Sequence, residues 1–202
     1  DTDAALAKYD KVILATGASI LKRNLGEGIP IISAQEAIDT FCKSGIGQGE
    51  KIVIFDEEGS WISASIAEEL ANRGYQIHLA SPTASLFSQI TTYSKLALIP
   101  RLKDLGVQFH LASEVVVVPG SVQIKSSLSS QDLALTNVLA VLDCGPRRSN
   151  DQLYQSAKFE DSARVLIIGD ALAPRTVAEA TYGANAVGAF LDLDLALSSL
   201  EN

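Results

Sequence analysis

Residues 51–74 read KIVIFDEEGSWISASIAEELANRG, and the fold class follows from this stretch. Its first five residues, 51–55, are mostly apolar and β-branched, which is typical of a strand buried on both faces of a parallel sheet. Gly59 then marks a turn, apolar residues recur at helical spacing, and Gly74 provides a left-handed cap where the helix ends. The order of strand, glycine turn and helix predicts the opening of a dinucleotide-binding fold.

The turn carries acidic residues where a phosphate-binding turn carries glycines. Glycines let the chain turn sharply and bring backbone N–H groups close to a pyrophosphate, and here Gly59 alone has that freedom, followed by Ser60. Asp56–Glu58 place three carboxylates in the turn, and residues 80–82 offer no acidic group to bind a ribose. The turn is therefore either a working NAD(P)H site or one that is weakened or empty. Trp61 either stacks on an adenine or packs on the sheet.

Composition and charge exclude several classes of function. The chain has 202 residues, 47% of them hydrophobic, which is enough for a substantial core. The net charge of −8 argues against a nucleic-acid-binding surface, which needs a basic patch. No apolar run reaches the roughly 18 residues that a membrane span requires. Cys42 and Cys144 form no C-x-x-C pair, so we expect a reducing, cytoplasmic setting, although a disulfide between them stays open.

Strands alternate with helices along the chain, which predicts an α/β protein with Rossmann-like units. We expect an NAD(P)-like Rossmann domain at residues 48–145. Residues 1–47 and 146–202 then form part of a second, FAD/ADP-type nucleotide-binding domain. Gly45, Gly47 and Gly49 favour a hinge near the first boundary. Three short apolar stretches predict a small β-meander: residues 114–118, 122–125 and 138–142.

Two further motifs follow predicted strands. Ala15, Thr16 and Gly17 end the apolar run that starts at Lys11, and a glycine at this place lets the backbone pass close to a ligand. Gly145 follows another apolar strand in the same way. Each is also compatible with a plain strand end.

The sequence IIGDALAPRT, residues 167–176, joins a strand to a long helix. Gly169 and Asp170 form a turn that can place a carboxylate on a ribose or ribitol hydroxyl. Thr176 begins the helix, whose N-terminus can face an anion. The alternative is that Asp170 only stabilises the turn before the helix.

Other reactive side chains are expected to be structural. His78 and His110 each lie within a predicted strand, and neither has metal-ligand spacing. Cys144 has no evident base beside it and is expected to be a small buried thiol. Arg147 and Arg148 either meet phosphates or lie in a solvated loop.

The order of these motifs resembles the two-dinucleotide-domain flavoproteins of the glutathione reductase type. Within that class five stretches look like the C-terminal half of the NADH:flavin oxidoreductases related to trimethylamine dehydrogenase, histamine dehydrogenase and 2,4-dienoyl-CoA reductase. The resemblance covers nearly the whole chain, and GDALAPRT is its most specific piece. The stretches are YDKVILATGAS (9–19), ISAQEAIDTF (32–41), KIVIFDEEGSWISASIAEELANRGYQIHLASP (51–82), TTYSKLALIPRLKDLGVQF (91–109) and IIGDALAPRTVAEATYGANAVGAF (167–190).

The resemblance implies roles for the motif residues by position. Ala15–Gly17 match the segment that passes the edge of FAD or ADP, and Gly169–Asp170 match a pair that contacts the flavin nucleotide. Gly59–Trp61 match the second nucleotide turn, and Gly145 matches the strand-end glycine of the second domain. The acidic turn looks like the amine-dehydrogenase branch, which holds ADP or gives this site no hydride-transfer role.

The sequence also departs from that family. Nothing matches its N-terminal barrel with FMN, its iron–sulfur cysteines or the first G-x-G-x-x-G, and the chain contains no methionine. We therefore expect a fragment that is inactive alone and has no catalytic residue. Its expected partners are a nucleotide, the barrel region of the parent enzyme, an electron-transfer protein and a second copy of the chain. Two alternatives remain: an NAD(P)H-to-FAD module of the dienoyl-CoA reductase type, and a degenerate Rossmann scaffold without ligand.

Overall fold

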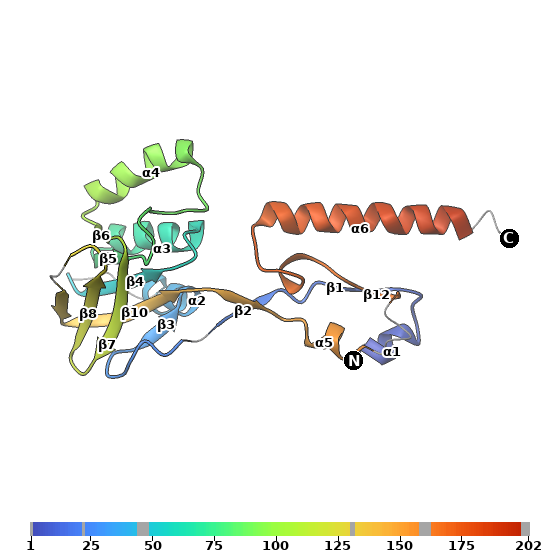
Figure 1. The fold of residues 1–202 in the computed structure, drawn as a ribbon, viewed down its shortest axis with the longest axis horizontal. Coiled ribbons are helices and arrows are strands. Elements are labelled where there is room, and N and C mark those ends of the chain that lie inside the picture. Colours follow the sequence, from blue (N-terminus) through green and yellow to red (C-terminus); the bar gives the residue numbers. More distant parts are fainter. Residues whose placement is uncertain (1, 22, 44–48, 130–131, 158–162, 199–202) are drawn as a thin grey trace. The chain divides into compact units, whose positions relative to one another are not determined.

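The computed structural model describes residues 2–21, 23–43, 49–129, 132–157 and 163–198. The chain divides into two compact units, which are described separately (Figure 1). Unit 1 consists of residues 1–21 and 147–202, and unit 2 of residues 22–146.

Unit 2 is built on five strands in the order β3-β10-β4-β5-β6, all of them parallel. Strands and helices alternate from β4 to β6, as the sequence predicts. The elements are β3 (Ile31–Ser33), α2 (Ala34–Ala37), the π-helical turn η1 (Ile38–Cys42), β4 (Lys51–Asp56), α3 (Trp61–Asn72), β5 (Gln76–Ala80), α4 (Thr92–Asp104), β6 (Gln108–His110), β7 (Ser113–Val118), β8 (Ser121–Ser126), β9 (Leu133–Thr136) and β10 (Val138–Cys144).

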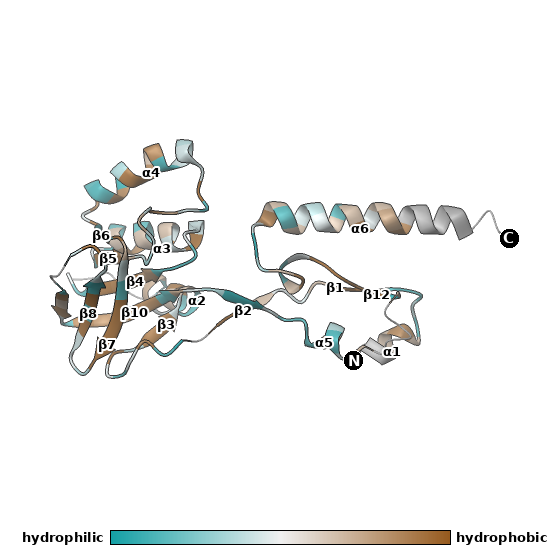
Figure 2. Cartoon of the chain, in the orientation of Figure 1, coloured by the Kyte–Doolittle hydropathy of each residue, from teal (hydrophilic) through white to brown (hydrophobic). Residues whose placement is uncertain are grey.

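Both faces of this sheet are covered, which explains why its central strands are mostly apolar. Successive side chains of a strand point to opposite faces. Ile52 and Ile54 of β4 pack with α2, α3 and α4, whereas Val53 and Phe55 pack on the antiparallel sheet β7-β8-β9. Figure 2 shows β7 and β10 coloured mainly as hydrophobic.

The α/β class and the small β-meander are confirmed, with one correction. The meander's third strand is β9, whereas residues 138–142 belong to β10 in the parallel sheet. The pattern of buried and exposed residues distinguishes the two strands. β10 is buried at six of its seven positions, and β9 buries only Leu135. A strand between β3 and β4 needs two apolar faces, and a meander strand needs one.

Helix ends in unit 2 follow the capping signals of the sequence. Ser33 and Glu36 form the predicted capping box at α2, in which each side chain bonds the other's backbone N–H. Gly74 has φ +89° just after α3, as a left-handed cap requires.

Residues 23–43 lie in unit 2, whereas the sequence assigned them to the domain of residues 1–47 and 146–202. The physical reason is β3, which pairs in parallel with β10 through Ile31, Ile32 and Ser33. The hinge predicted at Gly45 and Gly47 lies outside the described residues.

Unit 1 holds two small sheets. β1 (Val12–Leu14) pairs in parallel with β12 (Val165–Ile167), and β2 (Ala18–Ile20) pairs antiparallel with β11 (Arg147–Ser149). Its core is small and centres on Leu6, Leu14 and Val165. The remaining elements are α1 (Thr2–Leu6), α5 (Gln152–Gln155), the 3-10 turn η3 (Gly169–Ala171) and α6 (Val177–Ser198).

The long helix α6 has apolar residues on several sides. Ala180, Gly183 and Val187 form its less exposed stripe at helical spacing, while Val177 and Tyr182 are exposed. No helix in the described part of the chain is both long and apolar enough to span a membrane.

His78 and His110 form a stacked pair on neighbouring strands β5 and β6. Their rings lie 5.4 Å apart at 12°, and Nδ1 of His78 lies 3.1 Å from Nε2 of His110. Burial, the neighbouring His110 ring and Lys51 lower the pKa of His78 from 6.5 to about 4. Burial also lowers the pKa of His110. Both rings are therefore neutral at physiological pH, in keeping with the structural role expected for them.

This pair predicts that unit 2 loses stability in mild acid. The folded-state pKa of His78 lies below the unfolded value, so the unfolded chain takes up the proton first as pH falls. The stabilisation is complete above pH 6.5 and is lost as pH falls towards 4. Between pH 6.5 and 5 we expect a loss of about 1–2 kcal/mol in urea unfolding. His78→Gln should remove most of this dependence, and a wild-type stability that stays flat over this window would contradict the account.

Candidate functional site

The sheet order of unit 2 fixes where a ligand crevice would lie. From β4 the chain winds outward through β5 to β6, and β10 lies on the other side of β4. The order therefore reverses between β4 and β10, and open α/β sheets bind ligands beyond the carboxyl ends of such strands. Asp56 and Cys144 end these two strands and lie opposite each other.

Gly59 lies in the turn after β4 and is covered by a neighbouring segment. Its φ is +69°, and a Cβ built there would lie 2.7 Å from the backbone N of Ser88. The Gly59 carbonyl accepts a hydrogen bond from the Gln89 N–H at 3.0 Å. The close approach that the glycine permits is therefore made by the chain's own residues 88–89.

Ser60 caps α3 with a side chain that bonds within the same turn. Its Oγ accepts from the Ile62 N–H at 3.3 Å and donates to Oε2 of Glu58 at 3.0 Å. Trp61 lies at the start of α3 with half of its surface, 50%, exposed to solvent. A carboxylate consequently stands beside the helix N-terminus, where a bound phosphate would need positive potential.

Asp56 is buried with an incomplete set of hydrogen bonds. Its Oδ1 accepts from the Gly59 N–H at 2.8 Å, whereas its Oδ2 has no hydrogen-bond partner among the described residues. Burial raises the pKa of the Asp56 carboxyl, and Glu58 raises it further. Burial also raises the pKa of the Cys144 thiol, with Asp56 contributing, so Cys144 is an inert buried thiol as expected.

Arg23 lies over the carboxyl ends of β4 and β10. Its Nε donates to Oδ2 of Asp143 at 3.2 Å, its Nη2 bonds the other Asp143 oxygen, and its Nη1 bonds Glu57. The guanidinium carbon also lies 4.8 Å from the centre of the Phe55 ring. A Cβ on Gly145 would lie 2.7 Å from that carbon, so Gly145 leaves room for the guanidinium.

In unit 1 the Ala15–Gly17 segment is held by one residue from the other end of the sequence. The Thr16 Oγ1 donates to the Asn150 carbonyl at 2.5 Å, and the Asn150 side-chain amide donates to the Thr16 carbonyl at 3.1 Å. The Asn150 N–H donates to the Gly17 carbonyl at 3.0 Å. Gly17 has φ +70° and open space where a Cβ would stand, and Ala15 is exposed. This backbone is accessible to a ligand.

Asp170 links its own turn to β11 through a clamp with Arg147. Its Oδ2 accepts from Nη1 of Arg147 at 2.5 Å and its Oδ1 accepts from the Arg175 N–H at 3.1 Å. Arg147 also donates through Nη2 to the Arg175 carbonyl at 2.8 Å. Gly169 has φ +62° and starts the turn. A ligand hydroxyl would therefore share Asp170 with Arg147.

Thr176 lies directly before α6 and bonds Glu179 in the first turn of that helix. Its N–H donates to Oε2 of Glu179 at 3.1 Å, and its hydroxyl donates to the same oxygen. These hydrogen bonds lower the pKa of Glu179. The helix N-terminus is thus partly satisfied by the chain's own carboxylate.

A cavity of about 570 Å³ lies between η3 and α6, entirely within unit 1. Gly169 lines it, whereas Asp170 and Thr176 do not. Its lining combines mostly apolar residues with Arg175 and Glu179. Cavities of this size hold small-molecule ligands and cofactor fragments.

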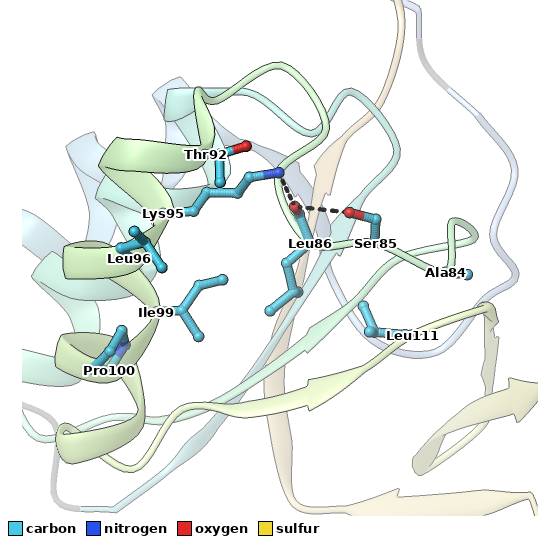
Figure 3. A pocket seen from close by; sticks show the side chains of 9 residues that line it. All are labelled: Ala84, Ser85, Leu86, Thr92, Lys95, Leu96, Ile99, Pro100 and Leu111. Atoms are coloured by element: carbon cyan, nitrogen blue, oxygen red, sulfur yellow. Dashed lines mark hydrogen bonds between the residues drawn. The ribbon is translucent and has the colours of Figure 1, made fainter.

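A second cavity, of about 410 Å³, lies in unit 2 beside α4 (Figure 3). Leu86, Leu96 and Ile99 line it, and the Lys95 Nζ donates to the Leu86 carbonyl at 3.3 Å. None of the residues proposed from the sequence lines this cavity.

The structure brings the predicted residues together in two groups, one in each unit. Gly59, Ser60 and Gly145 lie near the reversal point of unit 2, although Gly59 faces Ser88 and Gly145 faces Arg23. Arg23, Ser88 and Asn150 could not be predicted from the sequence, because each acts through a contact with residues distant in sequence. No group of three or more His, Cys, Asp or Glu side chains in the described ranges could hold a metal ion.

The sequence matches no protein-family model and no curated protein sequence. Solved structures do match. Histamine dehydrogenase from Rhizobium sp. 4-9 has a TM-score of 0.73 and 25% identity, over 90% of this chain and 30% of that one. The 6-hydroxypseudooxynicotine amine oxidase from Pseudomonas geniculata N1 has a TM-score of 0.73 and 23% identity, over 93% and 30%. The HOCl-induced flavoprotein disulfide reductase from Escherichia coli has a TM-score of 0.62 and 15% identity, over 88% and 43%.

The chain therefore has the Rossmann-like fold of flavin- and NAD(P)-type oxidoreductases, as the sequence predicted. It spans 30% of the length of the first two of these structures.

The contact between Gly59 and Ser88 predicts a large cost for a side chain at Gly59. Gly120 offers a matched control, because it too has a positive φ but open space around its missing Cβ. We expect Gly120→Ala to destabilise unit 2 by about 1 kcal/mol through backbone strain alone. Gly59→Ala should cost about 3 kcal/mol because Ser88 must also move. Equal losses in urea unfolding would mean that residues 88–89 do not cover this turn.

The Asp170 clamp predicts different effects for two adjacent arginines. Arg147→Gln should destabilise unit 1 by about 1–2 kcal/mol, since it leaves Asp170 without its charged donor. Arg148→Gln should stay within about 0.5 kcal/mol, because that side chain is exposed on the same strand. Denaturant unfolding followed by Tyr fluorescence or hydrogen exchange of residues 169–176 measures both. A clamp that serves no structural purpose would make the two variants alike.

Proposed function

We propose that this chain is the nucleotide-binding region of an FMN/iron–sulfur oxidoreductase of the amine-dehydrogenase type. In this proposal unit 1 holds ADP or the ADP part of FAD, and unit 2 has no hydride-transfer role. The barrel region with the catalytic residues and an electron-transfer protein are its partners. The likeness to two amine-oxidising enzymes supports the class of the parent protein.

One observation carries the assignment of roles to the two units. The space in front of Gly59, where a pyrophosphate would approach the turn, is taken by Ser88 and Gln89. Glu58 reaches the cap of α3 through Ser60, so the turn offers a carboxylate and no free N-terminal cap. A dinucleotide would have to displace protein and overcome like charge, which disfavours the NAD(P)H module alternative.

Unit 1 fits a nucleotide better. Gly17 presents open backbone at the end of β1, and the cavity beside Gly169 has room for a cofactor fragment. Asp170 holds a carboxylate at the helix start, oriented by Arg147 and the Arg175 N–H. A flavin nucleotide bound here would supply the electron-carrying group, and these residues would orient its ribose or ribityl hydroxyls.

A ligand-free scaffold is the second candidate, and the bonding of Asp170 and Thr176 favours it. Both side chains already have partners inside the chain. In this case the two residues only stabilise the turn before α6, and no nucleotide binds.

Binding measurements separate the three functions. Isothermal titration of the purified chain with ADP, FAD and NADH should show binding of ADP or FAD and none of NADH. Asp170→Asn should weaken that binding about 5–10-fold, which corresponds to one hydrogen bond to a charged group. Asp151→Asn is the matched control, because Asp151 bonds Gln155 in the same unit.

Each of the other outcomes would favour a different function or a different site. NADH binding tighter than ADP and FAD would favour the hydride-transfer module. No binding of any of the three would favour the scaffold. Unchanged affinity in Asp170→Asn would remove Asp170 from the site while leaving unit 1 in place.

A further inference from the structure

The crevice at the reversal point of unit 2 is occupied by the chain itself. Arg23 precedes β3, yet its guanidinium lies over the ends of β4 and β10, which come 30 and more residues later in the sequence. It contacts one residue from each strand end, Asp143 on β10 and Glu57 just after β4. This is the place where sheets of this topology bind their ligands.

The contacts around the guanidinium form a set that suits a planar cation. Asp143 binds it through two nitrogens, which is the paired geometry that distinguishes guanidinium from ammonium. The Phe55 ring lies under its carbon atom at 4.8 Å, within the range of cation–π attraction. Gly145 is the fourth residue around the guanidinium, and a Cβ there would lie 2.7 Å from the guanidinium carbon, so a larger residue would displace the Arg23 side chain.

The charge of this crevice favours a cation over an anion. Asp143 and Glu57 bring two carboxylates against one guanidinium, and Glu58 adds a further carboxylate in the same turn. The Asp143 side chain is 6% exposed and that of Arg23 is 20%, so solvent screens the pair incompletely. Burial alone would lower the pKa of Arg23, but the bonds to Asp143 and the charge of Glu57 outweigh it and raise the pKa.

We propose that this crevice is a cation-binding cradle formed by Phe55, Glu57, Asp143 and Gly145, with Arg23 as its built-in occupant. Its ligand class is the guanidinium group and closely related planar cations, whereas nucleotides and other phosphates are excluded. The cradle also fastens residues 23–29 to the sheet, next to Leu25, whose carbonyl accepts from the Val117 N–H at 2.6 Å. It is independent of whether unit 1 binds ADP or FAD.

Removing the occupant and supplying its head group in solution tests the cradle. In Arg23→Ala the cradle keeps its carboxylates and loses its cation, so the variant should unfold at a lower temperature than the wild type. Ethylguanidinium at about 20 mM should then raise the Tm of Arg23→Ala saturably by about 2–4 °C, relative to sodium chloride of equal ionic strength. The wild type should not respond, because its cradle is filled.

Arg101→Ala is the matched control. Arg101 forms a two-nitrogen pair with Glu68, like the pair of Arg23 with Asp143, but with a side chain that is 52% exposed. Its Tm should be the same in ethylguanidinium and in sodium chloride. If Arg23→Ala does not fold, Arg23→Lys keeps the charge without the planar fork, and it should show the same response at reduced size.

Two results would overturn the proposal. An equal response of Arg23→Ala and Arg101→Ala, or no response of either Arg23 variant, would mean that the pair is an ordinary ion pair. A gain of NADH or pyrophosphate binding in Arg23→Ala would mean that Arg23 only blocks an anion site. We expect no such gain, because the vacated crevice is more negative than the filled one. Failure of ADP and FAD to bind the wild type would contradict the proposed function and leave this inference untouched.

Discussion

The parallel alignment of β4 and β10 is the constraint on which the rest of unit 2 depends. Because both strands are buried on both faces, their side chains alternate between the helical layer and the β7-β8-β9 sheet. Because they run in the same direction, they end side by side, with Asp56 opposite Cys144. The common end of the two strands brings the polar groups of the crevice together. Phe55 and Asp143 form one register pair, and Arg23 contacts both.

The chain's own residues fill this crevice. Gly59 retains the positive φ of a ligand-binding turn, but the approach it allows is used by Ser88. Gly145 retains the open strand end, but Arg23 fills it. Glycines that would admit a dinucleotide here admit protein instead, so a glycine at the expected position indicates close approach without saying what approaches. Unit 1 differs, since Gly17 faces open space.

Local patterns predicted the fold well, and distant contacts explain what they missed. The strand of residues 51–55, the helix that ends before Gly74 and the capping box of Ser33 and Glu36 all follow from residues close in sequence. The prediction that residues 138–142 belong to the meander was wrong. Their apolar run fits either the meander or the parallel sheet until the partner strands are known. The placement of residues 23–43 depended on the pairing of β3 with β10, which lies more than 100 residues away. The candidate sites show the same division: the turns were predictable, and Arg23, Ser88 and Asn150 were not.

A nucleotide that binds unit 1 as proposed should leave the β4–β10 crevice of unit 2 unchanged. Titration of ADP into the ¹⁵N-labelled chain, followed by backbone amide shifts, tests this most directly. We expect shifts at Thr16, Gly17 and Gly169, with the amides of Gly59 and Ser60 unchanged. Shifts concentrated at Gly59 and Ser60 would place the nucleotide at the acidic turn and contradict the claim.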